Sequence, residues 1–189
     1  MQKERAREFI KDKFAQITER EKKTFNDNIF KNFVELFDLK EPLKIGSYIS
    51  KENEVCSKQI NNYILEKGSE LFLPKIYENQ KQKKIKFFRF LRSDSLIKGK
   101  YNLMEPKSLR KPIKPNYLDF IIIPVRAINK ANKRLGFGGG FYDRSLKNVD
   151  KLKFLSLCYE FQLNLSFKAD YHDLELTTLI YPGGYFKKA

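Results

Sequence analysis

The feature that most constrains the fold is the run Asp119-Phe-Ile-Ile-Ile-Pro124, in the second half of the chain. Its apolar residues follow one another without the alternation of a half-exposed strand, which indicates a strand buried on both faces. Such strands are typical of parallel sheets that carry helices on each side. The proline ends the run, because it cannot donate a hydrogen bond to a neighbouring strand. The sequence therefore predicts a layered α/β protein.

The segments around this run alternate between helical and strand-like patterns. Apolar residues recur every three or four positions in the first forty residues, which predicts helix. Further helices are predicted at residues 54–66 and 141–148, and strands at residues 44–49, 70–73, 84–91, 119–124, 153–158 and 176–180. The strand at 70–73 is expected to stop at Pro74, and 84–91 is expected to be an edge strand or hairpin. We see no repeat or linker, so residues 1–189 are expected to form a single domain.

This order of elements predicts a three-layer αβα sandwich with a mostly parallel central sheet. The layering is Rossmann-like, but the chain has no Gly-x-Gly-x-x-Gly turn near its start followed by an acidic residue. A dinucleotide-binding domain is therefore disfavoured.

Composition narrows the class of protein further. Hydrophobic residues make up 41% of the 189 residues, enough for a core. No apolar run approaches the roughly 18 residues that a membrane helix needs, and the first residues lack the apolar stretch of a secretory signal. Cys56 and Cys158 are too few for a disulfide framework or a zinc cluster. We therefore expect a soluble cytoplasmic protein with no membrane partner.

The formal net charge is +15, and most of the excess is local. Residues 75–114 contain thirteen Lys and Arg but only three Asp and Glu. Such a segment attracts polyanions, among them nucleic acids, nucleotide phosphates and polycarboxylates. Composition alone favours a solvated lysine-rich surface, and the chain has no RNP, KH or zinc-finger pattern. A nucleic-acid partner is the less favoured alternative.

The segment from Arg134 to Arg144 carries the strongest functional signal. Four of the nine glycines lie within it, at Gly136, Gly138, Gly139 and Gly140. Glycines between a buried strand and a helix let backbone N–H groups approach a phosphate, and the flanking arginines suit phosphate oxygens. Asp143 is a possible Mg²⁺ ligand, although it is equally explained as an acid that offsets a helix dipole. The pattern does not fit the P-loop.

This segment resembles the signature of a known family. Arg134-Leu-Gly-x-Gly-x-Gly-x-Tyr-Asp143 is similar to the motif of the 5-formyltetrahydrofolate cyclo-ligases, also called methenyltetrahydrofolate synthetases. Further landmarks of that family occur in order along nearly the whole chain. They are Lys3-x-x-x-Arg7, Tyr48-Ile49-Ser50, Asn53-Glu54-Val55, Leu73-Pro74, Glu105-Pro106, Asp119–Pro124 and Phe161-Gln162.

The resemblance implies an enzyme of one-carbon metabolism that uses ATP and Mg²⁺. Its reaction closes 5-formyltetrahydrofolate to 5,10-methenyltetrahydrofolate through a phosphorylated formyl group, with release of ADP and phosphate. Such a reaction mainly requires that two ligands be positioned and that phosphate charge be neutralised, so it needs no nucleophilic side chain.

The resemblance also implies roles for individual residues. Catalysis would involve Arg134 and Tyr142, and Asp143 would bind the metal, so that Asp143→Asn should reduce turnover without unfolding the protein. ATP would contact Lys3, Arg7, Arg134, Gly136, Gly138, Gly139, Gly140 and Tyr142. Folate would contact Ile49, Glu54, Tyr101 and Phe141. Without the resemblance, Lys3 and Arg7 are better explained as solvated surface, Glu54 as an acid in a first helical turn, and Tyr142 as core.

Two positions depart from the family pattern. Thr177 stands where some relatives carry an acidic second contact to magnesium. Asp173, Glu175 or water could replace it. Gly139 stands where some members carry Lys or Arg, which removes one phosphate contact. A divergent member that acts on another substrate is therefore a second alternative. We expect a monomer, and a basic segment that attracts polyglutamylated folates.

Overall fold

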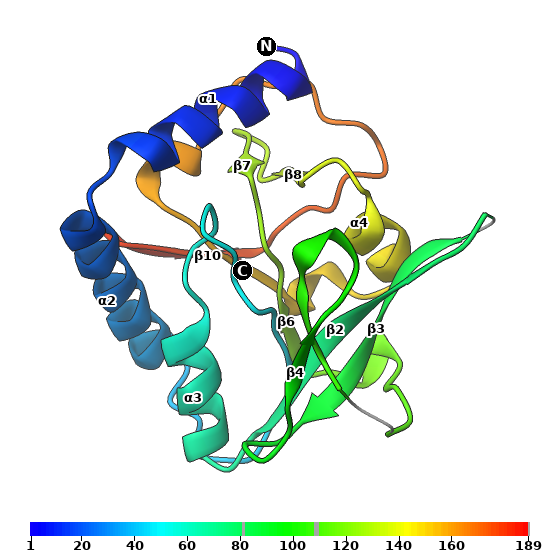
Figure 1. Cartoon of the computed structure of the whole chain (residues 1–189). Coiled ribbons are helices and arrows are strands. Elements are labelled where there is room, and N and C mark those ends of the chain that lie inside the picture. The colour runs from blue at the N-terminus through cyan, green and yellow to red at the C-terminus, as the bar shows by residue number, and fades with distance from the viewer. Residues whose placement is uncertain (81, 108–109, 189) are drawn as a thin grey trace.

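The computed structural model describes residues 1–80, 82–107 and 110–188, and in this part of the chain the main sheet has seven strands (Figure 1). In chain order they are β1 (Lys44–Gly46), β2 (Glu70–Glu78), β3 (Lys83–Phe90), β6 (Phe120–Ile122), β9 (Phe154–Leu157), β10 (Thr178–Tyr181) and β11 (Gly184–Lys187). Across the sheet the order is β11-β10-β9-β6-β1-β2-β3. The five inner strands are parallel, and the edge strands β3 and β11 are antiparallel to their neighbours. The predicted mostly parallel sheet is confirmed.

The helices lie mainly on one face of the sheet (Figure 1). They are α1 (Lys3–Gln16), α2 (Glu19–Leu36), α3 (Lys58–Glu66) and α4 (Phe141–Leu146). Alternating residues of β6 and its continuation divide between two cores, because successive side chains of a strand point to opposite faces. Phe120 and Ile122 pack with α1, α2 and α3, whereas Ile121 and Ile123 pack on the side of Leu146 in α4. The layered α/β architecture is therefore confirmed, with a second outer layer made of one short helix and irregular segments.

The first forty residues form two helices. Thr18 separates them by capping α2: its hydroxyl accepts from the Glu21 backbone N–H, and the Glu21 carboxylate accepts from the Thr18 N–H. This reciprocal capping box fixes where the second helix starts. Two amphipathic helices can then cover different parts of one sheet face.

Two predicted boundaries are wrong. The third helix begins at Lys58, so Glu54 lies in the preceding loop and not in a first helical turn. The second strand continues past Pro74 to Glu78. It can do so because β1 pairs only with residues 70–72, so that beyond them β2 has β3 alone as a partner in the main sheet. A proline is tolerated on such a free edge, where its missing N–H leaves no strand partner unpaired.

The path of the chain reverses direction in the sheet between β1 and β6. From β1 it continues through β2 to β3, whereas from β6 it continues through β9 to β10 and β11. In open α/β sheets, ligands bind in the crevice outside the carboxyl ends of the strands at such a switch point. Two small ribbons flank this crevice, β4 (Leu96–Lys98) with β5 (Met104–Pro106) and β7 (Ala127–Ile128) with β8 (Arg134–Leu135). Within the described ranges, no helix is long and apolar enough to cross a membrane.

Candidate active site

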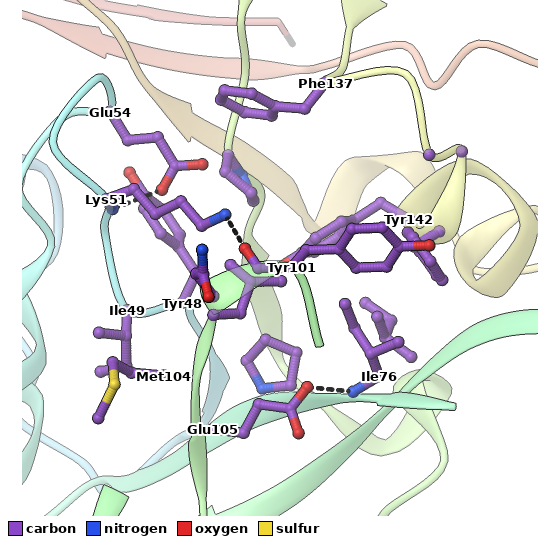
Figure 2. A pocket seen from close by; sticks show the side chains of 18 of the residues that line it. Tyr48, Ile49, Lys51, Glu54, Ile76, Tyr101, Met104, Glu105, Phe137 and Tyr142 are labelled. Atoms are coloured by element: carbon purple, nitrogen blue, oxygen red, sulfur yellow. Dashed lines mark hydrogen bonds between the residues drawn. The ribbon is translucent and has the colours of Figure 1, made fainter. Parts of the chain in front are cut away.

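A cavity of about 490 Å³ lies at the carboxyl ends of β1, β2 and β6 (Figure 2). Tyr48 and Ile49 follow β1, Ile76 belongs to the end of β2, and Pro124 follows β6. The volume is within the ordinary range for small-molecule sites, and the lining is mainly apolar with a few polar groups. The topology of the sheet therefore places a ligand-sized cavity at the switch point.

The four residues that the sequence assigned to folate all line this cavity. They are Ile49, Glu54, Tyr101 and Phe141, which come from three separate segments of the chain. The Tyr101 and Phe141 rings meet edge to face with centroids 5.7 Å apart. Tyr101 adopts a left-handed backbone conformation with φ of 57° and remains half exposed at the rim.

Glu54 is the acidic group on the cavity wall nearest the loop after β1. Burial raises the pKa of its carboxyl group, although the Lys51 backbone N–H and the charges of Lys51, Arg126 and Arg134 oppose that shift. The N–H of Lys51 donates to Glu54 Oε2 at 2.8 Å, and the Lys51 ammonium donates to the Tyr101 carbonyl at 2.6 Å (Figure 2). Lys51, which the sequence analysis missed, thus links the two segments that carry Glu54 and Tyr101.

Glu105 is a second lining residue that the sequence analysis did not assign to the site. Its carboxylate is buried and accepts from the Ile76 backbone N–H at 2.8 Å. This bond satisfies the edge of β2 just beyond Pro74, so it anchors β5 against the strand. Gly99 permits the contact, because a Cβ there would lie 2.4 Å from Glu105 Cδ. The Glu105-Pro106 landmark was the available signal.

The glycine-rich loop, residues 136–140, forms another wall of the cavity with Gly139 and Gly140. Gly138 and Gly140 have φ of +99° and +62°, a region that residues with a Cβ enter only at a cost. Among the described residues, the backbone N–H groups of Gly138, Gly139 and Gly140 donate to no other group of the chain. These donors are thus available to a ligand.

Arg134 and Asp143, at the two ends of the signature, pair with each other. Arg134 Nη1 donates to both carboxylate oxygens of Asp143 at 2.9 Å, and Arg134 Nε donates to the Pro124 carbonyl. Both side chains are buried, with 4% and 10% of their side-chain surfaces exposed. The guanidinium also lies over the Tyr142 ring, 5.4 Å from its centroid. The pair therefore joins the last strand before the loop to the helix after it.

Tyr142 lies on the cavity wall beside Arg134. Burial raises the pKa of its phenol, and the charge of Glu54 raises it further. The hydroxyl therefore stays protonated near neutral pH and can serve as a hydrogen-bond donor to a ligand oxygen.

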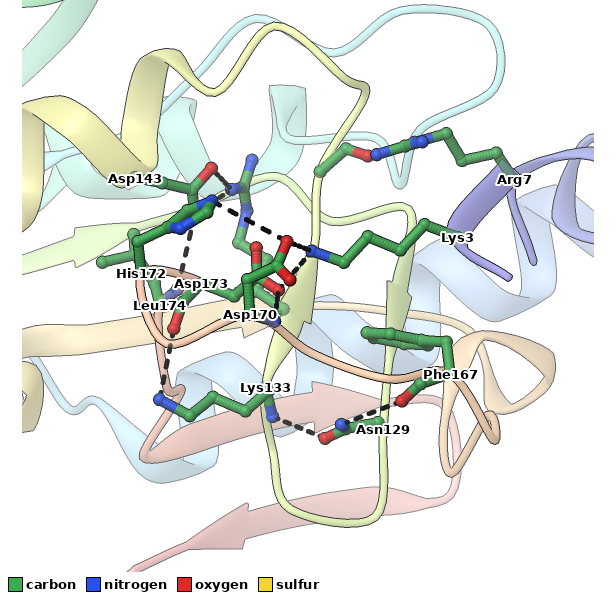
Figure 3. A network of polar contacts seen from close by, with 12 residues as sticks. Lys3, Arg7, Asn129, Lys133, Asp143, Phe167, Asp170, His172, Asp173 and Leu174 are labelled. Carbon is green, nitrogen blue, oxygen red and sulfur yellow. Dashed lines mark hydrogen bonds and ion pairs between the residues drawn. The ribbon is translucent and has the colours of Figure 1, made fainter. Parts of the chain in front are cut away.

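Lys3 and Arg7 project from one face of α1 but have different surroundings (Figure 3). The Lys3 ammonium contacts Asp170 at 2.7 Å and Asp173 at 2.5 Å. Partial burial lowers its pKa, but these two hydrogen bonds raise it by more. Arg7 Nε donates to the Gly136 carbonyl at 3.0 Å. Arg7 therefore reaches the glycine-rich loop, whereas Lys3 is held by a neighbouring acidic turn.

The side chains considered for a second metal contact already have partners within the chain. Thr177 is buried, and its hydroxyl donates to the carbonyls of Lys151 and Phe154. Glu175 pairs with Lys151 and Lys188. Asp173 could join Asp170 and His172 around a cation, but the Lys3 ammonium already contacts both carboxylates.

A second cavity of about 600 Å³ adjoins the first. The two share lining residues from the loop after β1, the rim at Tyr101 and the glycine-rich loop. Arg7 lines the second cavity, as does Arg126, which the sequence analysis missed. Arg126 directly follows the buried run that starts at β6, so a charged residue at the end of an apolar strand was the signal.

A family model described as the 5-formyltetrahydrofolate cyclo-ligase family matches residues 1–182. The chain belongs to this family. The resemblance drawn from the signature is thus confirmed, and with it the prediction of an enzyme. Three of its relatives, each 25–28% identical, cover most of the chain.

Among curated proteins, a 5-formyltetrahydrofolate cyclo-ligase of Haemophilus influenzae is 25% identical over 169 residues, 88% of this chain and 90% of the relative. Among solved structures, a 5,10-methenyltetrahydrofolate synthetase of Aquifex aeolicus has a TM-score of 0.84 and 28% sequence identity. The match covers 99% of this chain and 93% of the Aquifex chain. A Mycoplasma pneumoniae synthetase has a TM-score of 0.76 and 25% identity, with 96% and 99% coverage. The fold of the family therefore extends over the whole chain.

Proposed function

We propose that this enzyme converts 5-formyltetrahydrofolate to 5,10-methenyltetrahydrofolate at the expense of ATP. The observation that carries the proposal is the cavity at the switch point, where Ile49, Glu54, Tyr101 and Phe141 meet the glycine-rich loop. Residues assigned to folate and residues assigned to nucleotide thus line one space. Two ligands that must react with each other need such an arrangement.

The chemistry requires activation of an amide-like oxygen. The formyl oxygen attacks the terminal phosphorus of ATP and ADP leaves. N10 then attacks the formyl carbon, and phosphate leaves as the N10 proton is lost, which closes the five-membered ring. Both steps depend on alignment and on neutralisation of phosphate charge, because neither uses a nucleophilic side chain.

Three features of the cavity fit the folate. Glu54 offers a carboxylate to the amino and ring N–H groups of the pterin, and its partial desolvation strengthens such bonds. Ile49 and Met104 provide apolar contacts, and Tyr101 provides a ring at the rim. Tyr142 also lines this cavity, and its protonated hydroxyl can donate a hydrogen bond to the folate.

The nucleotide is assigned to the side of the glycine-rich loop and α1. Backbone donors at Gly138, Gly139 and Gly140 suit phosphate oxygens, and Arg7 approaches the loop at Gly136. Arg134 contributes indirectly, since its charge is matched by Asp143. Lys3 would have to leave Asp170 and Asp173 in order to bind phosphate, so we assign it first to the positioning of α1.

We assign magnesium to Asp143, which lines neither cavity itself but is paired with Arg134 on the wall of the first one. Mg²⁺ is usually held by one or two carboxylates, by substrate phosphates and by water, so one carboxylate oxygen is a sufficient protein contribution. Asp143 Oδ1 already accepts from Arg134 and from the Leu174 backbone N–H, whereas Oδ2 accepts from Arg134 alone and has a further lone pair for a metal. When bound, the metal would neutralise phosphate charge, and the two hydrogen bonds from Arg134 hold the Asp143 carboxylate in place.

The proposal is tested by mixing the purified protein with 5-formyltetrahydrofolate, ATP and Mg²⁺ and following the near-ultraviolet absorbance of the methenyl product. We expect ATP-dependent formation of product with stoichiometric ADP, and none when ADP replaces ATP. If folded protein binds both ligands without turnover, the divergent alternative with another substrate is favoured. Steep salt-dependent binding of RNA without turnover would favour the nucleic-acid alternative.

A cytoplasmic location, a monomeric state and a single domain over residues 1–189 remain predictions from the sequence. Size-exclusion chromatography with light scattering tests the oligomeric state. Limited proteolysis tests the domain, since a second folded unit would appear as a stable fragment.

A further inference from the structure

Arg126 is the most deeply buried cation on the wall of the second cavity. It lies between Val125 and Ala127, which are buried core residues, and only 7% of its surface is exposed. The segment follows β6, so this side chain stands at the carboxyl end of the strand that forms one side of the switch point. A permanent charge at this place is unusual, because arginine is almost never buried unless it is paired.

The contacts of Arg126 do not neutralise it. Its Nη1 donates to the Asn53 carbonyl at 3.3 Å and its Nη2 to the Arg7 carbonyl at 3.4 Å. The guanidinium lies 5.9 Å from the Phe14 ring centroid and 5.5 Å from that of Phe137. Within the described part of the chain it forms no ion pair with a carboxylate. The two long bonds to carbonyls leave further N–H donors of the guanidinium for a ligand.

The side chains that line the second cavity carry more positive than negative charge. Burial lowers the pKa of the Arg126 guanidinium, the charge of Glu54 raises it, and the charge of Arg7 lowers it again. Lys11 and Lys51 line the same cavity. Three acids also line it. Glu8 and Glu52 are exposed, so water screens them more than it screens a buried guanidinium, and Glu54 is the one partly buried acid among them. An anion in this cavity would therefore be attracted most strongly by Arg126.

The position of the glycine-rich loop indicates which anion. Phe137 of the loop covers the Arg126 guanidinium, and Arg7 joins α1 to the loop at Gly136. Arg126 thus lies on the wall of the second cavity, where α1 and the loop approach each other. Residues 136–140 of the loop contain no Lys or Arg that could face a ligand.

We propose that Arg126 is a direct ligand of the phosphate chain of the nucleotide, and supplies from the segment after β6 the cation that the glycine-rich loop lacks. This inference rests on the proposed use of ATP. A guanidinium can bind two phosphate oxygens at once, which a lysine ammonium cannot do in the same geometry. Arg126 then fixes the phosphates against the loop.

The test compares wild type with Arg126→Gln and Arg126→Lys in binding inorganic tripolyphosphate, β,γ-methylene-ATP and 5-formyltetrahydrofolate, each by calorimetry. We expect Arg126→Gln to weaken binding of tripolyphosphate and of the ATP analogue by about tenfold or more, with an intermediate loss for Arg126→Lys. Binding of 5-formyltetrahydrofolate alone should change less than about twofold. In turnover, the KM for ATP should rise more than the KM for folate.

Arg20→Gln is the matched control, since it removes one exposed positive charge from α2 outside the second cavity. It should leave all three affinities unchanged. If Arg126→Gln is too unstable to assay, Arg126→Lys retains the charge and still distinguishes a bidentate ligand from a structural residue. Unchanged affinity for tripolyphosphate in both variants would overturn the inference, as would a loss confined to folate.

Failure of the proposed function would look different. Wild type would then bind tripolyphosphate through Arg126 but produce no ATP-dependent methenyl signal. If wild type turns over with ATP and both Arg126 variants retain its KM for ATP, the proposed function stands and the role of Arg126 is wrong.

Discussion

Arg134 and Asp143 lie nine positions apart in the signature, and each compensates the burial of the other. A buried ion pair of this kind offers modest net stability over an apolar pair, but removing one partner leaves an uncompensated charge. Nη1 of the arginine contacts both carboxylate oxygens at 2.9 Å, which fixes the two ends of the glycine-rich loop relative to each other. At the scale of the residue, the same carboxylate thus has a structural role and a proposed role at the metal.

We expect Asp143→Asn to lower the free energy of unfolding by about 3 kcal/mol or more, because Arg134 would remain buried without its partner. Urea denaturation measures this effect, and Asp12→Asn, an exposed change on α1, should be neutral within about 0.5 kcal/mol. From the sequence alone we expected only turnover to change. A loss of turnover with unchanged stability would return Asp143 to a purely metal-binding role.

At Glu54, burial disfavours the ionised form of the carboxyl group. Its pKa is raised above the ordinary value of 4.5, so the folded state binds the proton more tightly than the unfolded state. Stability should therefore fall as pH rises through the window between 4.5 and the raised pKa. A functional site can retain such a destabilising group because the ligand needs it.

We expect Glu54→Gln to be more stable than wild type near neutral pH, with the difference disappearing below pH 4.5. The same change should weaken binding of 5-formyltetrahydrofolate by about tenfold or more, because a charged acceptor is lost. Thermal unfolding across pH and calorimetry measure the two effects. Glu52→Gln, at an exposed neighbouring position, should alter neither, and a Glu54→Gln variant that is less stable at neutral pH would contradict the argument.

At the scale of the element, helix α1 lies outside the sheet but contacts the site through two of its side chains. Lys3 ties it to the turn containing Asp170 and Asp173, and Arg7 ties it to the glycine-rich loop (Figure 3). The four-residue spacing puts both side chains on one face of the helix. The position of α1 therefore sets the position of Arg7.

We expect Lys3→Gln to reduce the free energy of unfolding by about 1–3 kcal/mol, because the largely buried Asp173 carboxylate loses its cation. Adding Asp173→Asn should restore part of this loss, so the two changes should be non-additive in urea denaturation. Arg5→Gln, an exposed change on the same helix, serves as the control. A large rise in the KM for ATP without any loss of stability would instead make Lys3 a phosphate ligand.

Sequence patterns were sufficient for elements that bury continuous or regularly spaced apolar residues. The run at 119–124 contains β6, and the strands at 153–158 and 176–180 correspond to β9 and β10 within two residues. The patterns failed where tertiary contacts override local preference. Pro74 does not end β2, because that edge of the strand faces Glu105 and not another strand of the main sheet. Residues 51–57 stay in a loop because the Glu54 carboxylate accepts a hydrogen bond from the Lys51 backbone N–H.

The site was predicted less completely than the fold, for a physical reason. The signature and its landmarks named Ile49, Glu54, Tyr101 and Phe141, and the structure brings them together. Lys51, Glu105 and Arg126 owe their positions to contacts between segments far apart in sequence. No spacing within one segment reveals such contacts.

At the scale of the whole molecule, the positive charge of residues 75–114 is less concentrated around the cavity than the composition of this segment indicates. Among the described residues, five of its cations pair with acids; these are Lys83, Arg89, Arg92, Lys100 and Arg110. Lys84 and Lys86 flank Ile85, which lines the first cavity, so their side chains leave β3 on the opposite face. The segment thus offers only some of its charge to a ligand at the cavity.

This division predicts how a polyglutamate tail would be attracted. Lys100 precedes Tyr101 at the cavity rim, and its contact with Glu78 is long, at 3.6 Å, and half exposed, so its ammonium can still meet a tail. Lys84 lies on the other face of the hairpin. We expect Lys100→Glu to raise the KM for a pentaglutamate form of the substrate by about two- to fivefold relative to the monoglutamate. Lys84→Glu makes the same change in net charge and should not distinguish the two substrates.

Steady-state kinetics at low and high ionic strength separate a local contact from the field of the whole molecule. A field set by the net charge of +15 would respond equally to both reversals and would be lost at high salt. A tail that lies along the rim responds to Lys100 in particular, and the preference for the longer substrate should decrease but not vanish as salt is added. If both reversals raise the KM of both substrates equally, the basic segment acts only as a diffuse surface charge, and the tail has no defined path from the cavity.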